Sequence, residues 1–404
     1  MDKIQWVPNR YAGEKYPLDF INDVVAKEAY EYHKSFDAYS ETPLVELKEL
    51  AKLLGVKSIY VKDESYRFGL NAFKVLGGSY AIGQYIAGRL GKHIRDLSFR
   101  ELISDEVKEK LGDITFITAT DGNHGRGVAW TAHVLRQKSI VYMPKGSAQE
   151  RLENIRKLGA DASILDCNYD ECVRRANAEA EKHGYVMVQD TAWEGYEDIP
   201  TWIIQGYATM AYEADLRLKE QKVVPTHVFV QAGVGSMASA MTGYFSAAYP
   251  DKKPCVMVVE PALADCLYRT AKANDGDLHF VTDDMNTIMA GLACGEPCTV
   301  AWKVLSSYAD HFISVPEYMA ALGMRVLGNP LKGDERVISG ESGAATAGPL
   351  VEILRRDEYR ELKEKLGLNE DSVVLLFSTE GDTDFDHYRR VCWDGLWACP
   401  EDIK

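Results

Sequence analysis

Short apolar runs alternate with longer amphipathic stretches along this 404-residue chain. The runs are rich in β-branched residues, a pattern typical of strands, and the stretches between them are typical of helices. The predicted strands are Ser58–Lys62, Thr115–Thr120, Ser139–Met143, Ala162–Leu165, Val186–Gln189, Thr226–Val230, Cys255–Glu260 and Ser372–Phe377. The predicted helices include Val75–Leu90, Gly127–Leu135 and Gln149–Leu158.

Strands that are apolar on both faces and alternate with helices indicate parallel sheets covered on both sides. We therefore predict an α/β fold of two doubly wound domains with mainly parallel sheets, because 404 residues exceed the usual length of one domain. Residues 1–80 and 213–404 are expected to form the larger domain, with residues 81–212 inserted as a smaller one. Ligands in such sheets bind beyond the carboxyl ends of the strands.

The composition excludes several classes of protein. With 61 acidic and 46 basic side chains and a formal charge of −15, the chain has no net positive field to attract nucleic acid. No run approaches the roughly 18 apolar residues of a membrane helix, and Met1–Trp6 lacks the apolar core of a signal peptide. Eight scattered cysteines predict no metal site and a reducing, cytoplasmic setting.

A glycine-containing turn follows the predicted strand Thr226–Val230. Gly233–Ser236 precedes a helical pattern, and glycines let the backbone approach a phosphate at a helix N-terminus. The same segment through Ala238, with Glu260 at the end of the next strand, also fits a dinucleotide fingerprint in outline. From this segment alone, a phosphate monoester, a nicotinamide cofactor and a simple tight turn all remain open.

Polar residues follow two further strands. Thr120–His124 follows one of them, and Asp190 follows Val186–Gln189. Either Asp121 or Asp190 alone has a simple explanation as a helix cap. If both strands belong to one sheet, the two carboxylates face the same cleft, where they suit proton transfer or the binding of a cationic group.

Lys74 lies at the start of a predicted helix, between Phe73 and Val75. Most of the 46 basic residues are expected to be solvated, and a single lysine is by default one of them. The apolar neighbours of Lys74 favour a different interpretation. A desolvated lysine loses basicity and can form a Schiff base with an aldehyde.

These features occur in an order that resembles the pyridoxal-phosphate enzymes of fold type II, the tryptophan synthase β-like group, from Pro43 to Asp384. Within that group, the segments TDGNHGRGVAW, QDTAWEGYEDIPTWIIQGY and FSTEGDTD are similar to the diaminopropionate ammonia-lyase family. Relatives in the wider group usually carry a serine where this chain has Asp121. They also carry a run of glycines where this chain has Gly233–Ser236.

The resemblance implies a cofactor, pyridoxal 5'-phosphate, and a role for each matching residue. Lys74 would hold the cofactor as a Schiff base and, once displaced by substrate, act as the base at Cα. The phosphate would be held by Gly233, Val234, Gly235 and Ser236, and the ring 3-hydroxyl would bond with Asn123. The ring nitrogen would meet Ser378 or Thr379, and Gly291 would lie near the cofactor. Near the substrate carboxylate would lie Thr120 and His124. A homodimer is likewise implied by the family.

The two aspartates favour one substrate within this group. A β-amino leaving group is an ammonium at neutral pH, and Asp121 or Asp190 would pair with it through a charge-assisted hydrogen bond. We therefore predict α,β-elimination of 2,3-diaminopropionate to pyruvate and two ammonia. The alternatives are a serine or threonine dehydratase, a nicotinamide-dependent dehydrogenase and a catalytically silent pyridoxal-phosphate-binding protein.

A hypothesis about stereochemistry follows from the same carboxylates. If Asp121 or Asp190 faces the side of Cα opposite Lys74, that carboxylate can deprotonate the D enantiomer while Lys74 serves the L enantiomer. The enzyme would then act on both forms of the substrate.

Overall fold

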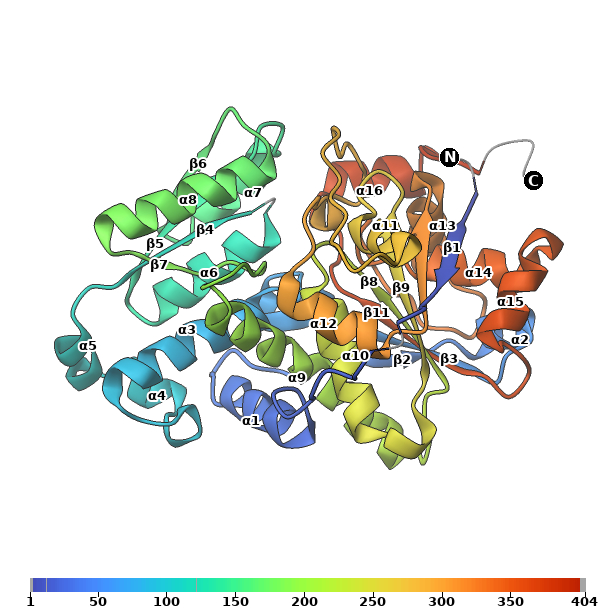
Figure 1. Cartoon of the computed structure of the whole chain (residues 1–404), viewed down its shortest axis with the longest axis horizontal. Helices are drawn as coiled ribbons and strands as arrows, with labels where there is room; N and C mark the ends of the chain where they lie inside the picture. Colours follow the sequence, from blue (N-terminus) through green and yellow to red (C-terminus); the bar gives the residue numbers. More distant parts are fainter. Residues whose placement is uncertain (1–2, 12, 121, 400–404) are drawn as a thin grey trace.

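The computed structural model describes residues 3–11, 13–120 and 122–399 and contains two sheets that lie side by side (Figure 1). The larger sheet has the strand order β1 (Gln5–Pro8), β10 (His311–Val315), β9 (Cys255–Pro261), β8 (His227–Gln231), β11 (Val373–Ser378), β3 (Ser58–Asp63) and β2 (Leu44–Glu46). The smaller sheet has the order β6 (Asp161–Ile164), β5 (Lys138–Met143), β4 (Thr115–Ala119) and β7 (Val186–Met187). The edge strand β1 pairs antiparallel with β10, and the other edge strand β2 pairs antiparallel with β3. The other strand pairs in the described ranges are parallel, so the predicted α/β class with mainly parallel sheets is confirmed.

Helices cover both sheets (Figure 1). They are α1 (Asp23–Lys34), α2 (Lys48–Leu54), α3 (Val75–Leu90), α4 (Phe99–Leu102), α5 (Asp105–Leu111), α6 (Asn123–Val134), α7 (Gln149–Arg156), α8 (Tyr169–His183), α9 (Asp198–Glu220), α10 (Ser236–Ala248), α11 (Cys266–Ala273), α12 (Thr299–Tyr308), α13 (Glu317–Gly328), α14 (Ala347–Arg355), α15 (Arg360–Leu366) and α16 (Phe385–Cys392). Within the described ranges, none of these helices is long and apolar enough to cross a bilayer.

The elements differ from the sequence-based predictions in a few places. The predicted helix Val75–Leu90 coincides with α3, whereas α6 begins four residues earlier than predicted. Strand β7 is only two residues long, because the side chain of Gln189 takes over the pairing and accepts a hydrogen bond from the N–H of Ala119 (3.0 Å). Strands β1, β2 and β10 were not predicted.

The predicted division into residues 1–80 with 213–404 and residues 81–212 has boundaries inside two helices. Residue 81 lies within α3 and residue 212 within α9, and these two helices pack against each other. The smaller sheet consists wholly of strands from the predicted inserted segment. The division itself stays a prediction.

Small residues allow three helices to approach closely around the start of α3. A Cβ added at Gly77 would lie 2.5 Å from the ring of Tyr207 on α9, and one added at Gly206 would lie 2.5 Å from the carbonyl oxygen of Leu76. On α6, a Cβ at Gly127 would lie 2.7 Å from the Cα of Val75. These positions therefore let α6 and α9 fix the backbone next to Lys74.

Four charged side chains are completely buried where β3 meets α9. Lys62 Nζ donates a hydrogen bond to Glu213 Oε2 at 2.6 Å. The guanidinium of Arg67 donates to both oxygens of Glu213 (2.8 and 2.7 Å) and to both oxygens of Glu64 (2.8 and 2.9 Å). Arg67 and Glu64 belong to the short 3-10 helix η1 (Glu64–Gly69), which leads toward Lys74.

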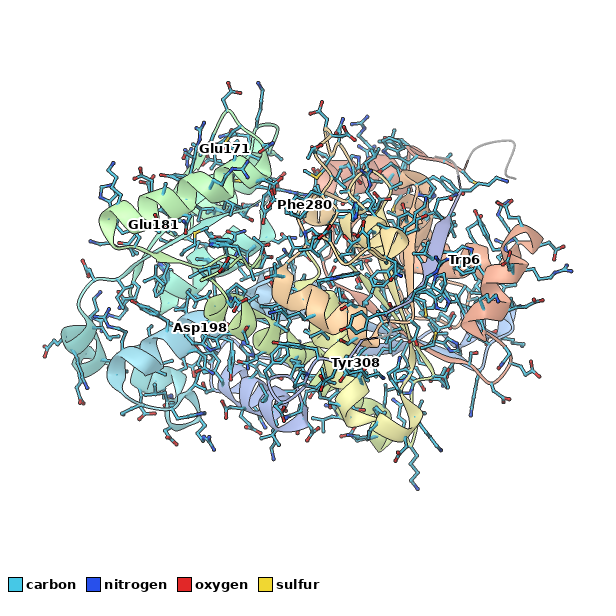
Figure 2. All side chains as sticks on the ribbon, viewed as in Figure 1. Trp6, Glu171, Glu181, Asp198, Phe280 and Tyr308 are labelled. Atoms are coloured by element: carbon cyan, nitrogen blue, oxygen red, sulfur yellow. The ribbon has the colours of Figure 1, made fainter. Side chains whose placement is uncertain are left out.

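Other charges lie on the outside of the molecule. Glu171 and Glu181 lie along α8 (Figure 2), where Glu171 pairs with Arg174 and Arg175 of the same helix. Such exposed pairs contribute little to stability.

The substitution Gly127→Ala is expected to lower the free energy of unfolding by about 1–3 kcal/mol, because the added methyl group would displace the backbone at Val75. Urea unfolding of the purified protein measures this change. Gly88→Ala is the matched control, since nothing lies within 4 Å of a Cβ added at this position of α3. That control should be neutral or stabilising by up to about 1 kcal/mol. Equal unfolding midpoints for Gly127→Ala and the wild type would contradict the packing explanation.

Candidate active site

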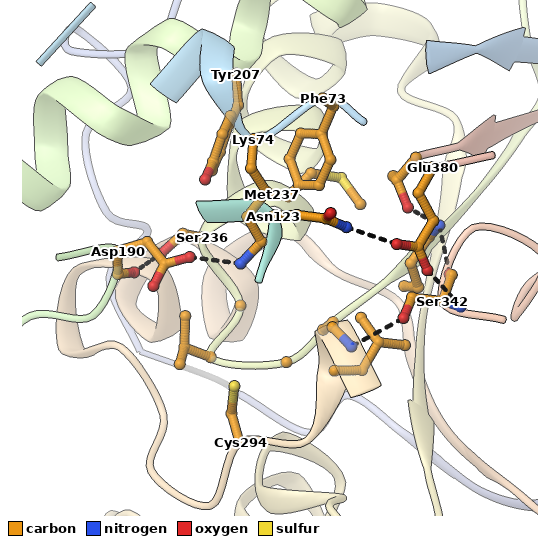
Figure 3. A pocket seen from close by; sticks show the side chains of 18 residues that line it. Phe73, Lys74, Asn123, Asp190, Tyr207, Ser236, Met237, Cys294, Ser342 and Glu380 are labelled. Carbon is orange, nitrogen blue, oxygen red and sulfur yellow. Dashed lines mark hydrogen bonds and ion pairs between the residues drawn. The ribbon is translucent and has the colours of Figure 1, made fainter. Parts of the chain in front are cut away.

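One cavity lies where segments from both sheets meet, beyond the carboxyl ends of β8 and β11 (Figure 3). Its walls come from segments that are far apart in the chain. The lining residues are Phe73, Lys74, Asn123, Asp190, Tyr207, Gln231, Ala232, Gly233, Val234, Gly235, Ser236, Met237, Gly291, Leu292, Cys294, Ser342, Thr379 and Glu380. The structure thus brings together most of the residues predicted for the site.

Lys74 and Asp190 form an ion pair inside this cavity (Figure 3). Lys74 Nζ donates to Asp190 Oδ2 at 2.6 Å, and the two side chains are 16% and 4% exposed. Lys74 lies immediately before the first residue of α3, and Asp190 follows β7. The pair therefore joins the start of α3 to the segment that follows β7 of the smaller sheet.

The environment of Asp190 keeps its carboxyl group charged. Burial by itself opposes the charge, but the nearby ammonium of Lys74, and secondarily His124, lower the pKa of Asp190 to about 2. On the other oxygen, Tyr169 Oη lies 3.5 Å from Oδ1. The cavity therefore holds a carboxylate whose charge is stabilised mainly by the ammonium of Lys74.

The turn at Gly233–Ser236 forms a concave backbone surface at the N-terminus of α10. Gly235 has a φ of 101°, a left-handed conformation that favours glycine, and a Cβ at Gly233 would lie 3.1 Å from Cys294 Sγ. The first N–H groups of a helix have no partners within the helix, so this turn is suited to an anion. Ser236 Oγ donates to the carbonyl oxygen of Asp190 (2.5 Å). Ser236 is the first residue of α10, so its backbone N–H is one of those without a partner within the helix.

Glu260 does not act as the acidic residue of a dinucleotide site. Its side chain is fully buried and accepts hydrogen bonds from the N–H groups of Leu267 (2.9 Å) and Tyr268 (2.6 Å) at the start of α11. Burial raises the pKa of Glu260 well above its usual range. The carboxyl group thus caps the N-terminus of α11, and it does not line the cavity.

Asn123, the first residue of α6, contacts the end of β11 across the cavity. Asn123 Nδ2 donates to Glu380 Oε2 at 2.6 Å (Figure 3). The second oxygen of Glu380 accepts from the N–H of Ser342 at 3.1 Å, and Ser342 Oγ accepts from the N–H of Gly291 at 3.0 Å. A chain of hydrogen bonds therefore connects three separate walls of the cavity.

The two hydroxyl residues at the end of β11 differ in their surroundings. Thr379 lines the cavity, and its Oγ1 accepts a hydrogen bond from Gln231 Nε2 at 3.1 Å, so its own proton can be donated to a ligand. Ser378 Oγ instead donates to Ser339 Oγ at 2.8 Å and does not line the cavity. Of these two residues, Thr379 therefore faces the cavity and Ser378 does not.

Two further predicted residues, Thr120 and His124, lie at the end of β4 and in the first turn of α6. Thr120 Oγ1 accepts from the N–H groups of Gly122 (2.9 Å) and Gly125 (3.1 Å), and His124 Nε2 bonds with the carbonyl oxygen of Val188 (2.8 Å). Neither side chain is among those that line the cavity. Asp121 lies outside the described residues.

Several lining residues were not predicted from the sequence. Gln231, Ser342 and Glu380 take part in the hydrogen bonds described above, and Phe73 packs on Tyr207 with ring centroids 4.8 Å apart. A signal existed for two of them. Gln231 ends the strand before the glycine turn, and Glu380 directly follows Thr379.

Comparison with known proteins shows the class of enzyme and then the family to which the chain belongs. Residues 36–379 match the family described as pyridoxal-phosphate dependent enzyme. Diaminopropionate ammonia-lyase from Escherichia coli K12 is 52% identical over 397 residues, which is 98% of each chain, and the Salmonella typhimurium LT2 enzyme is 50% identical over 94% and 95%. The Escherichia coli crystal structure in complex with D-serine has a TM-score of 0.91, 50% identity, and coverage of 98% and 99%. The chain belongs to the diaminopropionate ammonia-lyase family.

The cavity fits pyridoxal phosphate, the cofactor of this class. Gln231 Oε1 is buried in its wall without a hydrogen-bond partner among the described residues, so an acceptor remains for a bound donor. The glycine turn at Gly233–Ser236 suits a phosphate, and Lys74 supplies an amine. Family membership and the position of Glu260 together decide against the nicotinamide alternative.

Lys74→Met is expected to destabilise the cofactor-free protein by about 3–5 kcal/mol at neutral pH, because it leaves the buried carboxylate of Asp190 without its cation. Burial alone then raises the pKa of Asp190 in the folded state above that in the unfolded state. Stability of the variant is therefore lost as pH rises through that raised pKa, so its deficit should grow between about pH 5 and about pH 7.5. Urea unfolding at both pH values measures the deficit. In the double variant Lys74→Met/Asp190→Asn the pH-dependent part should vanish; its persistence would show that another group causes it.

Proposed function

We propose that this protein catalyses the pyridoxal-phosphate-dependent α,β-elimination of 2,3-diaminopropionate to pyruvate and two ammonia. The observation that carries this proposal is a buried, charged Asp190 beside Lys74 in a cavity with a glycine turn for a phosphate. The activity named for the Escherichia coli and Salmonella relatives supports the same reaction.

Pyridoxal phosphate, when bound, supplies the electron-withdrawing ring that stabilises negative charge at the substrate Cα. Lys74 Nζ takes the proton from Cα. Asp190 accepts a charge-assisted hydrogen bond from the β-ammonium of the substrate and orients this leaving group. Before Lys74 takes this proton it is neutral, and the β-ammonium is then the cation that pairs with the carboxylate of Asp190. The ammonium leaves as ammonia with the electron pair of the Cβ–N bond and keeps its protons.

The cofactor-holding residues are proposed from their places in the cavity. The backbone N–H groups of Gly233, Val234, Gly235 and Ser236 hold the phosphate, and Asn123 bonds the ring 3-oxygen. Thr379, rather than Ser378, donates its hydroxyl proton to the ring nitrogen. Gln231 supports this role, because its Nε2 donates to Thr379 Oγ1 and leaves the hydroxyl proton available for the cofactor. Gly291 contributes to the wall facing the ring. Thr120, His124 and Asp121 remain proposed for contact with the substrate.

The anionic wall distinguishes this function from that of a serine or threonine dehydratase. A hydroxyl leaving group is neutral and leaves the charge of a buried carboxylate such as Asp190 uncompensated. A diamino substrate provides the matching cation. A catalytically silent cofactor-binding protein would need Lys74 to hold the cofactor but would have no use for a charged Asp190.

A homodimer in the cytoplasm is part of the same proposal. Family resemblance supports the dimer. The acidic composition and the scattered cysteines support the cytoplasmic setting.

The purified protein is expected to bind pyridoxal phosphate with a visible absorbance band, and borohydride should fix the cofactor to the peptide that contains Lys74. Mass spectrometry of the digested protein identifies that peptide. Release of pyruvate from 2,3-diaminopropionate should exceed release from L-serine, and Lys74→Ala should lower kcat by at least about 100-fold because it removes the base at Cα. Protein that gains no absorbance with the added cofactor, or that prefers serine, would overturn the proposal.

Both enantiomers of the substrate are expected to react, with different bases at Cα. Asp121→Asn and Asp190→Asn are to be assayed on D- and L-2,3-diaminopropionate separately. At least one variant should lose roughly 100-fold or more in kcat on the D form while keeping more of its activity on the L form. Equal losses on both enantiomers in both variants would refute the two-base hypothesis. The crystal complex of the Escherichia coli relative with D-serine supports a site that admits the D configuration.

A further inference from the structure

We propose that Glu380 is a positioning residue for the cofactor, acting through the side-chain amide of Asn123. This inference rests on the proposed role of Asn123 at the ring 3-oxygen. Glu380 directly follows Thr379 at the end of β11, is 3% exposed and lines the cavity. The resemblance to fold type II enzymes gave it no role.

A carboxylate can only accept hydrogen bonds, and this property determines the orientation of Asn123. Because Glu380 Oε2 lies 2.6 Å from Asn123 Nδ2, the NH₂ group must face Glu380 and the amide oxygen must face away. The NH₂ group carries a second proton, whose direction is then fixed as well. A residue at 380 that both donates and accepts would permit either amide orientation.

The carboxylate of Glu380 is itself held in place from the opposite side. Its Oε1 accepts from the N–H of Ser342 at 3.1 Å, and Thr383 Oγ1 lies 3.3 Å from Oε2. The backbone at Gly340 allows this approach, since a Cβ there would lie 3.2 Å from Glu380 Cγ. Glu380 therefore fixes Asn123, the first residue of α6, relative to the end of β11.

This arrangement adds a positional constraint that the glycine turn does not provide. The turn at Gly233–Ser236 is suited to the phosphate at one end of the cavity, whereas Asn123 and Glu380 lie on a different wall (Figure 3). Charge-assisted hydrogen bonds are short, and the bond between Asn123 and Glu380, at 2.6 Å, is a short one. Glu380 thus orients Asn123 before the cofactor binds.

The test is a double-mutant cycle on the affinity of the cofactor-free protein for pyridoxal phosphate, measured by absorbance titration. Asn123→Ala and Glu380→Ala should each weaken binding roughly 10-fold or more, as expected for the loss of a hydrogen bond to a charged group. The double variant should bind no more than about threefold more weakly than Asn123→Ala alone, because the two residues act as one unit. Glu380→Gln should fall between Glu380→Ala and the wild type, since its amide oxygen can still accept from Asn123.

The absorbance maximum of the bound cofactor is the second readout, and it should shift in the same way in Asn123→Ala and Glu380→Ala. Glu260→Gln serves as the matched control, because Glu260 is also buried and accepts from backbone N–H groups but lies outside the cavity. It should leave cofactor affinity and absorbance unchanged. If Glu380→Ala does not fold, as judged by circular dichroism, the isosteric Glu380→Gln carries the test.

The outcomes separate this inference from the proposed function. Losses that multiply in the double variant, or unchanged affinity in both Glu380 variants, would overturn the role of Glu380 while leaving Asn123 at the cofactor. Unchanged affinity in Asn123→Ala would instead overturn the proposed role of Asn123 and, with it, the inference.

Discussion

Four buried charges constrain the part of the fold that leads to the active site. Lys62, Glu64, Arg67 and Glu213 are fully buried, and removing such charges from water is costly unless each is paired with good geometry. The planar guanidinium of Arg67 satisfies both carboxylates at once only if β3, η1 and α9 keep one arrangement. The chain then continues from η1 to Lys74, so the position of the lysine depends on this network.

Neighbouring contacts extend the same constraint to α3. His33 on α1 is buried, and burial lowers its pKa to about 3, so it is neutral in the folded protein. Its ring bonds with the carbonyl oxygen of Leu76 (3.0 Å) and with Thr209 Oγ1 (2.8 Å). Together with the close approach of Gly127 to Val75, these contacts hold the first turn of α3 from three sides. A rigid backbone at Lys74 is what a reacting amine requires.

The sequence predicts those parts of the site that depend on strand ends. Asp190 and Gly233–Ser236 each follow a strand, and ligands bind beyond the carboxyl ends of such strands, so each could be predicted as a site residue. Their strands, β7 and β8, belong to different sheets, so the sequence did not indicate that the two segments share one cavity. The bond between Asn123 and Glu380 joins residues 257 positions apart, and nothing local to either residue indicates it. For the same reason Lys62 and Glu213, 151 positions apart, resemble ordinary surface charges in the sequence. The short strands β1 and β2 were missed because three or four residues carry too little periodicity.

The pairing of Lys74 with Asp190 connects the electrostatics of the site to its choice of substrate. Asp190 is charged because Lys74 is charged, so a reaction that uses Lys74 as a neutral base removes the compensating cation from a buried carboxylate. Another cation must take its place at that moment, and the β-ammonium of a diamino acid can do so. A hydroxyl substrate brings no such charge, and the uncompensated carboxylate would add to its reaction barrier. In the proposed reaction, the residues of this single 2.6 Å contact therefore provide both the base and the discrimination against serine.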